Sequence, residues 1–125
     1  MQSILIVDDS AIMRSVIKKA LRMSGYGDAT CLEAGDGRDA LELLRSQPVD
    51  LVFADLIMPF MGGDVLIDTM SAEAALANIP VIIVSTEGSE TRLEQIKRPQ
   101  VVGRLRKPFT PEQFRETLQQ SLEVV

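Results

Sequence analysis

The stretch Leu51-Val52-Phe53-Ala54-Asp55 is a short apolar run that ends in a carboxylate. Ile4 to Val7 and Val81 to Val84 form two further runs of the same kind. An apolar run of this length without polar alternation is typical of a strand covered on both faces, as in a parallel sheet. The three runs therefore predict central parallel strands, and the run that ends at Asp55 is the third strand along the chain.

Segments with helical periodicity lie between the apolar runs. In two of them apolar residues recur at every fourth position, at Met13, Ile17 and Leu21 and at Phe114, Leu118 and Leu122. Each stripe predicts a helix that packs on a sheet. Ser10 precedes the first of these helices and Thr110-Pro111 opens the last, as is usual at helix N-termini. We also expect Met13, Met23 and Met70 to lie at core positions.

Five strand–helix units in this order define the expected fold class. Right-handed crossovers place helices on both faces of a sheet, so we expect an α/β, flavodoxin-like, doubly wound fold. Its parallel sheet should have five strands in the order 2-1-3-4-5, accompanied by five helices. No linker, repeat or low-complexity tract interrupts the units, so we interpret residues 1–125 as a single domain. Pro99 should end the fourth helix early.

The composition excludes several kinds of protein. The 125-residue chain has a net charge of -5, which argues against nucleic-acid binding. It contains no histidine, and so no imidazole metal site, no Ser-His or Cys-His catalytic pair and no phosphohistidine. The single cysteine, Cys31, excludes an internal disulfide and is expected to be a core thiol. Without a signal-peptide pattern or a bilayer-length apolar stretch, we expect a cytoplasmic protein with no membrane insertion.

Polar side chains follow the predicted strands at their carboxyl ends. They are Asp8 and Asp9 after the first strand, Asp55 after the third, Ser85 and Thr86 at the fourth, and Lys107 at the fifth. Because the carboxyl ends of parallel strands meet at one edge of a sheet, these side chains should share one crevice. Three carboxylates in one crevice repel one another unless a cation or protons compensate their charge.

The chemistry of this crevice favours Mg²⁺ as a cofactor. Carboxylate oxygens, with water in the remaining positions, suit a hard octahedral ion, whereas zinc would require histidine or several cysteines. A lysine and a hydroxyl beside carboxylate-bound Mg²⁺ can neutralise and hydrogen-bond phosphoryl oxygens. These residues alone leave open whether phosphate is bound, hydrolysed or transferred to Asp55.

Four motifs resemble those of the receiver domain of two-component response regulators, and in particular its CheY-like members. They are Ile6-Val7-Asp8-Asp9-Ser10, the segment from Asp55-Leu56-Ile57-Met58-Pro59 to Gly63, Val84-Ser85, and Lys107-Pro108-Phe109. The resemblance covers essentially the whole chain. It implies that Asp55 accepts a phosphoryl group from the phosphohistidine of a sensor histidine kinase. It also implies a signalling module that is not an enzyme beyond its own phosphorylation and dephosphorylation.

The same resemblance implies a role for each remaining site residue. The implied Mg²⁺ ligands are the carboxylates of Asp9 and Asp55, Asp8 through a water, and the backbone carbonyl of Ile57. Lys107 would pair with the phosphoryl oxygens, and the Ser85 hydroxyl would bind one of them once Asp55 is modified. The Lys107-Pro108 peptide bond would be cis.

Two positions depart from the usual pattern of this family. Arg104 stands where an aromatic ring usually turns inward on activation, and Arg98-Pro99-Gln100 stands where a small turn is common. Positive charge is concentrated near the fifth strand, at Lys97, Arg98, Arg104 and Arg106. These charges either keep an edge strand from pairing with other sheets or dock an acidic protein target. The target would bind the face formed by the fourth helix, fifth strand and fifth helix.

A stand-alone chemotaxis-type regulator is the function we favour from the sequence. The stretches from Asp9 to Arg14 and from Ser85 to Ser89 resemble CheY-type proteins, and no output domain follows Val125. The alternative within this class is the receiver domain of a longer regulator. A Mg²⁺-dependent phosphohydrolase would need a second aspartate where Ile57 stands. A flavin or dinucleotide binder would need a glycine-rich loop after the first strand, where the sequence is acidic.

Overall fold

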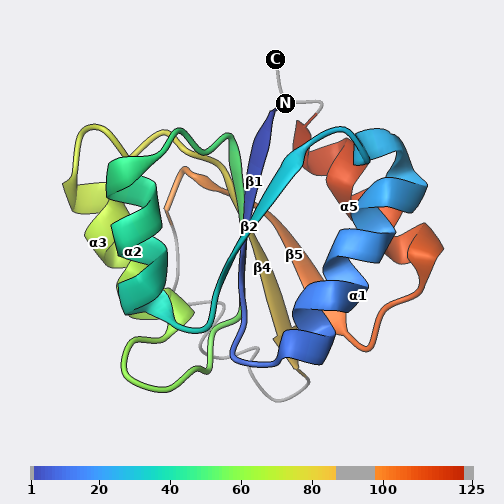
Figure 1. Cartoon of the computed structure of the whole chain (residues 1–125), viewed down its shortest axis with the longest axis horizontal. Coiled ribbons are helices and arrows are strands. Elements are labelled where there is room, and N and C mark those ends of the chain that lie inside the picture. The colour runs from blue at the N-terminus through green and yellow to red at the C-terminus, as the bar shows by residue number, and fades with distance from the viewer. Residues whose placement is uncertain (1, 87–97, 123–125) are drawn as a thin grey trace.

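The computed structural model of the chain describes residues 2–86 and 98–122. Its strands are β1 (Ser3–Val7), β2 (Thr30–Ala34), β3 (Leu51–Ala54), β4 (Val81–Thr86) and β5 (Val101–Lys107). They form one parallel sheet in the order β2-β1-β3-β4-β5 (Figure 1). The predicted topology and fold class are confirmed.

Helices cover both faces of the sheet. The α-helices of the described residues are α1 (Ala11–Leu21), α2 (Gly37–Ser46), α3 (Gly63–Ala72) and α5 (Pro111–Leu122). Figure 1 shows α1 and α5 on one face and α2 and α3 on the other. The helix predicted between β4 and β5 falls on residues 87–97, which lie outside the described residues. Pro99 lies in the turn that precedes β5.

The core consists of two apolar layers, one on each face of the sheet. Alternate residues of β3 point into opposite layers, Val52 toward α2 and α3 and Phe53 toward α1 and α5. The ring of Phe53 stacks on that of Phe114 in α5, with the centroids 5.4 Å apart. A slip of β3 by one residue would exchange the two layers, so packing fixes its register. Asp55, which follows β3 directly, is therefore held at one place.

Side-chain caps determine where α1 and α5 begin. Ser10 Oγ accepts a hydrogen bond from the Met13 N–H at 3.2 Å. At α5 the Thr110 N–H donates to Gln113 Oε1 at 2.9 Å, and the Gln113 N–H donates to Thr110 Oγ1 at 3.1 Å. The second arrangement is a reciprocal capping box. Both predicted caps are confirmed, and they limit the length of the loops that follow β1 and β5.

One prediction about the core is wrong. Met23 is 54% exposed, whereas Met70 is buried and Met13 is partly buried against the core. The regular helix α1 ends at Leu21 and continues as a π-helical turn, Arg22–Tyr26, in which Gly25 has a φ of 95°. Met23 lies two residues beyond Leu21, about 200° further around the helix, so it points away from the stripe formed by Met13, Ile17 and Leu21.

Two expectations from composition can be compared with the structure. Cys31 is partly buried against the layer under α1, and burial raises the pKa of its thiol. Among the helices of residues 2–86 and 98–122, none combines the length and apolar character that a bilayer span requires.

Candidate functional site

Parallel pairing brings the carboxyl ends of β1 and β3 to the same level. Val7 lies beside Ala54, and the Asp55 N–H donates to the Val7 carbonyl at 3.0 Å. On the other side of β1, the Asp8 N–H donates to the Ala34 carbonyl at 3.1 Å. Backbone hydrogen bonds thus hold the first residue beyond each strand. Asp8 and Asp55 therefore project from adjacent strands at one edge of the sheet.

Asp8, Asp9 and Asp55 form an acidic cluster at this edge. Each residue offers one carboxylate oxygen, and these atoms all lie within 4.8 Å of one another. Asp8 is 1% and Asp55 8% exposed, whereas Asp9 is exposed to solvent. The acidic cluster therefore has two buried members and one side that is open to solvent.

Lys107 reaches the acidic cluster from the end of β5. Its Nζ donates to Asp8 Oδ2 at 2.7 Å and to Asp55 Oδ2 at 3.3 Å. The other oxygen of each carboxylate accepts a backbone N–H, from Ser10 for Asp8 and from Leu56 for Asp55. Both buried carboxylates are thus fixed in orientation. The Lys107-Pro108 peptide bond is cis, as the resemblance implied.

Burial and charge shift the pKa values of this group. Burial raises the pKa of the Asp55 carboxyl and the negative charge of Asp8 adds to the rise, while Lys107 opposes it. For Lys107, burial alone would lower the pKa, but the hydrogen bonds and charges of Asp8 and Asp55 outweigh it and raise the pKa. Lys107 therefore stays cationic at neutral pH, and the negative charge of Asp55 is incompletely compensated.

The donor atoms of the acidic cluster fit Mg²⁺. Three ionised carboxylates and one ammonium leave two negative charges, the amount that a divalent cation neutralises. Oxygens on opposite sides of Mg²⁺ lie about 4 Å apart, since each Mg–O bond is about 2.0–2.1 Å. The oxygens of the acidic cluster, within 4.8 Å of one another, are close to this spacing already. Small side-chain movements would suffice to surround the ion.

Ser85 and Ile57, the other two predicted site residues, follow the same edge of the sheet. Ser85 is buried in β4, two residues beyond the residue that pairs with Ala54 of β3. Ile57 lies in the loop after Asp55, and its side chain is exposed. The hydrogen bonds of the described residues connect neither side chain to the acidic cluster. The structure therefore brings together Asp8, Asp9, Asp55 and Lys107, with Ser85 at the carboxyl end of the adjacent strand β4 and Ile57 two residues along the chain from Asp55.

Arg14 is a neighbour of the site that sequence reasoning missed. Its Nη1 donates to the Asp8 carbonyl at 2.6 Å, and its Nε donates to Glu33 Oε1 at 2.9 Å. Hydrogen bonds from Lys18 and then Arg14 hold the pKa of Glu33 below its ordinary value. A signal was present, because α1 carries basic residues and no acidic ones, so that their partners had to come from another element. Arg14 ties α1 to β2 beside the backbone of Asp8.

The arginines near β5 do not share one environment. Arg104 and Arg106 are exposed on β5, the edge strand, and alternate with a buried residue, as the strand period predicts. Arg98 instead pairs with Asp68 of α3, with Nη2 2.9 Å from Oδ1. Lys97, the fourth predicted charge, lies outside the described residues. Of the four predicted charges, Arg104 and Arg106 are therefore the two that the structure places on one surface, that of β5.

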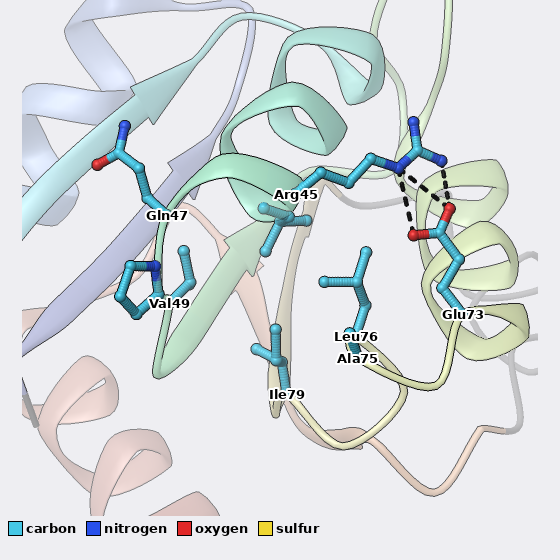
Figure 2. A pocket seen from close by; sticks show the side chains of 9 residues that line it. Arg45, Gln47, Val49, Glu73, Ala75, Leu76 and Ile79 are labelled. Atoms are coloured by element: carbon cyan, nitrogen blue, oxygen red, sulfur yellow. Dashed lines mark hydrogen bonds and ion pairs between the residues drawn. The ribbon is translucent and has the colours of Figure 1, made fainter.

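A hollow of about 340 Å³ lies between the C-terminal ends of α2 and α3. Figure 2 shows the apolar side chains that line it, together with the Arg45–Glu73 ion pair beside them. Val49 and Ile79, which line the hollow, each lie two residues before a strand, β3 and β4 respectively. The hollow is therefore at the amino edge of the sheet, opposite the acidic cluster, and contains none of the predicted site residues.

The fold and the acidic cluster together define a class of protein. The profile of the response regulator receiver domain matches residues 4–119. The chain therefore belongs to the response regulator receiver family, whose members act in two-component signalling and bind Mg²⁺ through acidic residues.

Particular relatives resemble the chain over nearly their whole length. A CheY homologue of Campylobacter jejuni is 36% identical over 120 residues, which cover 95% of this chain and 91% of that protein. The chemotaxis protein CheY of Pseudomonas aeruginosa is 35% identical over 122 residues, covering 98% of this chain and 97% of that protein. The solved structure of chemotaxis protein CheY4 of Vibrio cholerae superposes with a TM-score of 0.84 at 30% identity, covering 98% of this chain and 99% of that chain.

Proposed function

We propose that the chain is a phosphorylation-activated receiver in which Asp55 accepts the phosphoryl group. The observation that carries this proposal is the position of the Asp55 carboxylate. It lies 3.3 Å from the Lys107 ammonium and within the acidic cluster formed with Asp8 and Asp9. A phosphoryl group that arrives there meets an ammonium and a site suited to a divalent cation. Both positive centres stabilise the charge on phosphoryl oxygens during transfer.

The transfer forms a bond between phosphorus and a carboxylate oxygen of Asp55. The bond between phosphorus and the donor breaks, and the donor leaves with its electron pair. With a sensor histidine kinase as donor, the leaving group is an imidazole, which then takes up a proton. Asp55 Oδ1 is engaged by the Leu56 N–H at 2.8 Å, so Oδ2, which faces Lys107, is the oxygen better placed to attack.

Mg²⁺ would be held by residues already close together. We assign the carboxylates of Asp9 and Asp55 as direct ligands, with the backbone carbonyl of Ile57 from the loop that follows. Asp8 would bind through a water, because Lys107 Nζ lies closer to its Oδ2, at 2.7 Å, than to Asp55 Oδ2, at 3.3 Å. Bound there, Mg²⁺ would supply the positive charge that Lys107 alone does not provide.

Phosphorylation would change the position of Ser85 and of the loop after β4. It replaces a carboxylate with a larger group of greater negative charge. The Ser85 hydroxyl would donate a hydrogen bond to a phosphoryl oxygen and draw the end of β4 toward Asp55. The signal would pass to a protein target on the face of β5, α5 and the helix predicted between β4 and β5. Arg104 and Arg106, exposed on β5, suit an acidic target, whose binding their charge reversal should weaken.

The relatives support a stand-alone role in chemotaxis. The chemotaxis proteins described above match the chain over at least 91% of their own length. We therefore propose that residues 1–125 are one receiver domain that signals by itself. The receiver domain of a longer regulator is the alternative, and the length of the intact protein in its native cell distinguishes the two.

Intact-mass measurement tests phosphoryl acceptance. After incubation with acetyl phosphate and Mg²⁺, we expect the protein to gain the mass of one phosphoryl group, and to gain none when EDTA is present. No adduct with Mg²⁺ would refute the proposal. Release of inorganic phosphate from small phosphate esters, in large excess over the protein, would instead indicate a phosphohydrolase.

A further inference from the structure

The loop after Asp55 contains an aromatic residue in a strained backbone conformation. Phe60 has a φ of 66°, in the left-handed region that L residues rarely adopt. The Met61 N–H donates to the Pro59 carbonyl at 2.7 Å, which makes Phe60 the central residue of a γ-turn. Phenylalanine has no short polar side chain with which to stabilise this conformation locally. Contacts from elsewhere must therefore hold it.

Burial does not hold Phe60, because the residue is 78% exposed. The guanidinium of Arg38 lies over its ring, with Cζ 3.9 Å from the ring centroid, a cation–π contact. Arg38 Nη2 is also 3.8 Å from Oδ2 of Asp36, the buried N-cap residue of α2. Asp36 in turn accepts the Asp39 N–H at 3.0 Å. Arg38, whose guanidinium lies over Phe60, therefore belongs to the first turn of α2, a helix with a capped N-terminus.

A second contact joins the same two segments. The Gly37 N–H donates to the Met61 carbonyl at 2.9 Å. The approach is so close that a Cβ at Gly37 would lie 2.6 Å from Met61 Cγ. The N-terminus of α2 thus contacts two successive residues of the loop, Phe60 through its side chain and Met61 through its backbone.

We propose that Arg38 is a positioning residue that holds Phe60 in the γ-turn and thereby keeps the loop from Leu56 to Gly62 in the conformation that serves Mg²⁺. This inference rests on the proposed function in one respect, the assignment of a Mg²⁺ ligand to this loop. Without Arg38, Phe60 can relax to an ordinary φ, and a smaller fraction of molecules keeps the loop conformation that binds Mg²⁺. The apparent affinity for Mg²⁺ then falls in proportion to that fraction.

Mg²⁺ titration by calorimetry, with four variants, tests the role of Arg38. Arg38→Ala should raise the Kd about twofold to fivefold, the range that loss of one exposed cation–π contact permits. Phe60→Asn should bind like the wild type, because asparagine tolerates the left-handed region. Arg38→Ala added to Phe60→Asn should change the Kd by less than about twofold, since no strain remains to be held. Arg115→Ala, an exposed arginine of α5, is the matched control and should change nothing.

Amide hydrogen exchange in the metal-free protein gives a readout that does not depend on Mg²⁺. Arg38→Ala should accelerate exchange of the Gly37 and Met61 amides, and Arg115→Ala should not. If the wild type fails to bind Mg²⁺, the proposed metal site is wrong, and the exchange rates alone decide whether Arg38 holds the loop. Unchanged exchange in Arg38→Ala, or an equal loss of affinity in the Phe60→Asn background, would overturn the inference.

Discussion

The ammonium nitrogen of Lys107 lies 2.7 Å from Asp8 Oδ2 and only 3.3 Å from Asp55 Oδ2, so the lysine is shared unequally. Its closer partner is Asp8, the more deeply buried of the two carboxylates. Asp55 has the longer contact, in agreement with the raised pKa of its carboxyl. The metal-free protein thus keeps an incompletely compensated negative charge at the position where the proposed function needs a cation.

Lys107→Met should destabilise the metal-free protein at neutral pH. The variant leaves two buried carboxylates without their ammonium partner, which costs about 1–3 kcal/mol when a buried polar partner is removed. Urea denaturation with and without Mg²⁺ measures the effect. Saturating Mg²⁺ should recover part of the loss in Lys107→Met, whereas a variant as stable as the wild type would show that the ion pairs contribute nothing.

Asp55→Asn should be more stable than the wild type at neutral pH in the absence of Mg²⁺. The pKa of Asp55 is raised by folding, first by burial, so its ionised form is disfavoured in the folded protein, and an amide removes that cost. The folded wild type binds the proton more tightly than the unfolded chain, so this cost decreases as pH falls below the folded pKa and is gone below the unfolded pKa. Thermal melts over pH should therefore show the two proteins converging toward acid. A constant difference at all pH values would contradict the assignment.

Gly63→Ala should unfold or strongly destabilise the protein. A Cβ at Gly63 would lie 2.1 Å from the Asp55 carbonyl oxygen, and the neighbouring atoms are backbone that cannot move aside. Gly35→Ala is a matched control, since nothing lies within 4 Å of a Cβ there. Circular-dichroism melts should show a large loss for the first variant and a small change for the second. Equal melting temperatures would contradict the close packing of α3 on the end of β3.

Gln100→Leu should destabilise the loop between α3 and β4. The buried Gln100 amide donates to the Leu76 and Ile79 carbonyls at 3.2 and 2.9 Å, and its Oε1 accepts from Ser71 Oγ at 2.7 Å. Leucine leaves these groups without their partner, at a cost of about 1–3 kcal/mol for a buried group. Urea unfolding should show this loss, and Gln119→Leu on the exposed surface of α5 should not.

The sequence was sufficient to predict the sheet and the acidic cluster for a simple physical reason. Central parallel strands need continuous apolar residues, as in Leu51 to Ala54, and parallel strands end at one edge. Knowing which residue follows each strand therefore placed Asp8, Asp9, Asp55 and Lys107 together. None of this required knowledge of side-chain conformation.

The features that could not be predicted depend on contacts between separate segments. The Arg38–Phe60 contact requires the first turn of α2 to lie against the loop after β3. The burial of the Gln100 amide requires one donor, the Ser71 hydroxyl of α3, and two acceptors, the Leu76 and Ile79 carbonyls in the loop that follows. Both outcomes depend on local geometry that the apolar pattern does not encode. Met23 was misplaced for another reason, because it lies two residues beyond Leu21 and therefore faces away from the apolar stripe of α1.

Locating the phosphoryl group tests the central claim most directly. The protein is incubated with acetyl phosphate and Mg²⁺ and reduced with borohydride, which converts a phosphorylated aspartate to homoserine, and its peptides are sequenced by mass spectrometry. We predict homoserine at position 55 in the wild type and in Asp28→Asn, an exposed aspartate outside the acidic cluster, and no conversion in Asp55→Asn. Conversion at another aspartate, or an undiminished phosphoryl adduct on Asp55→Asn, would contradict the assignment of Asp55 as the acceptor.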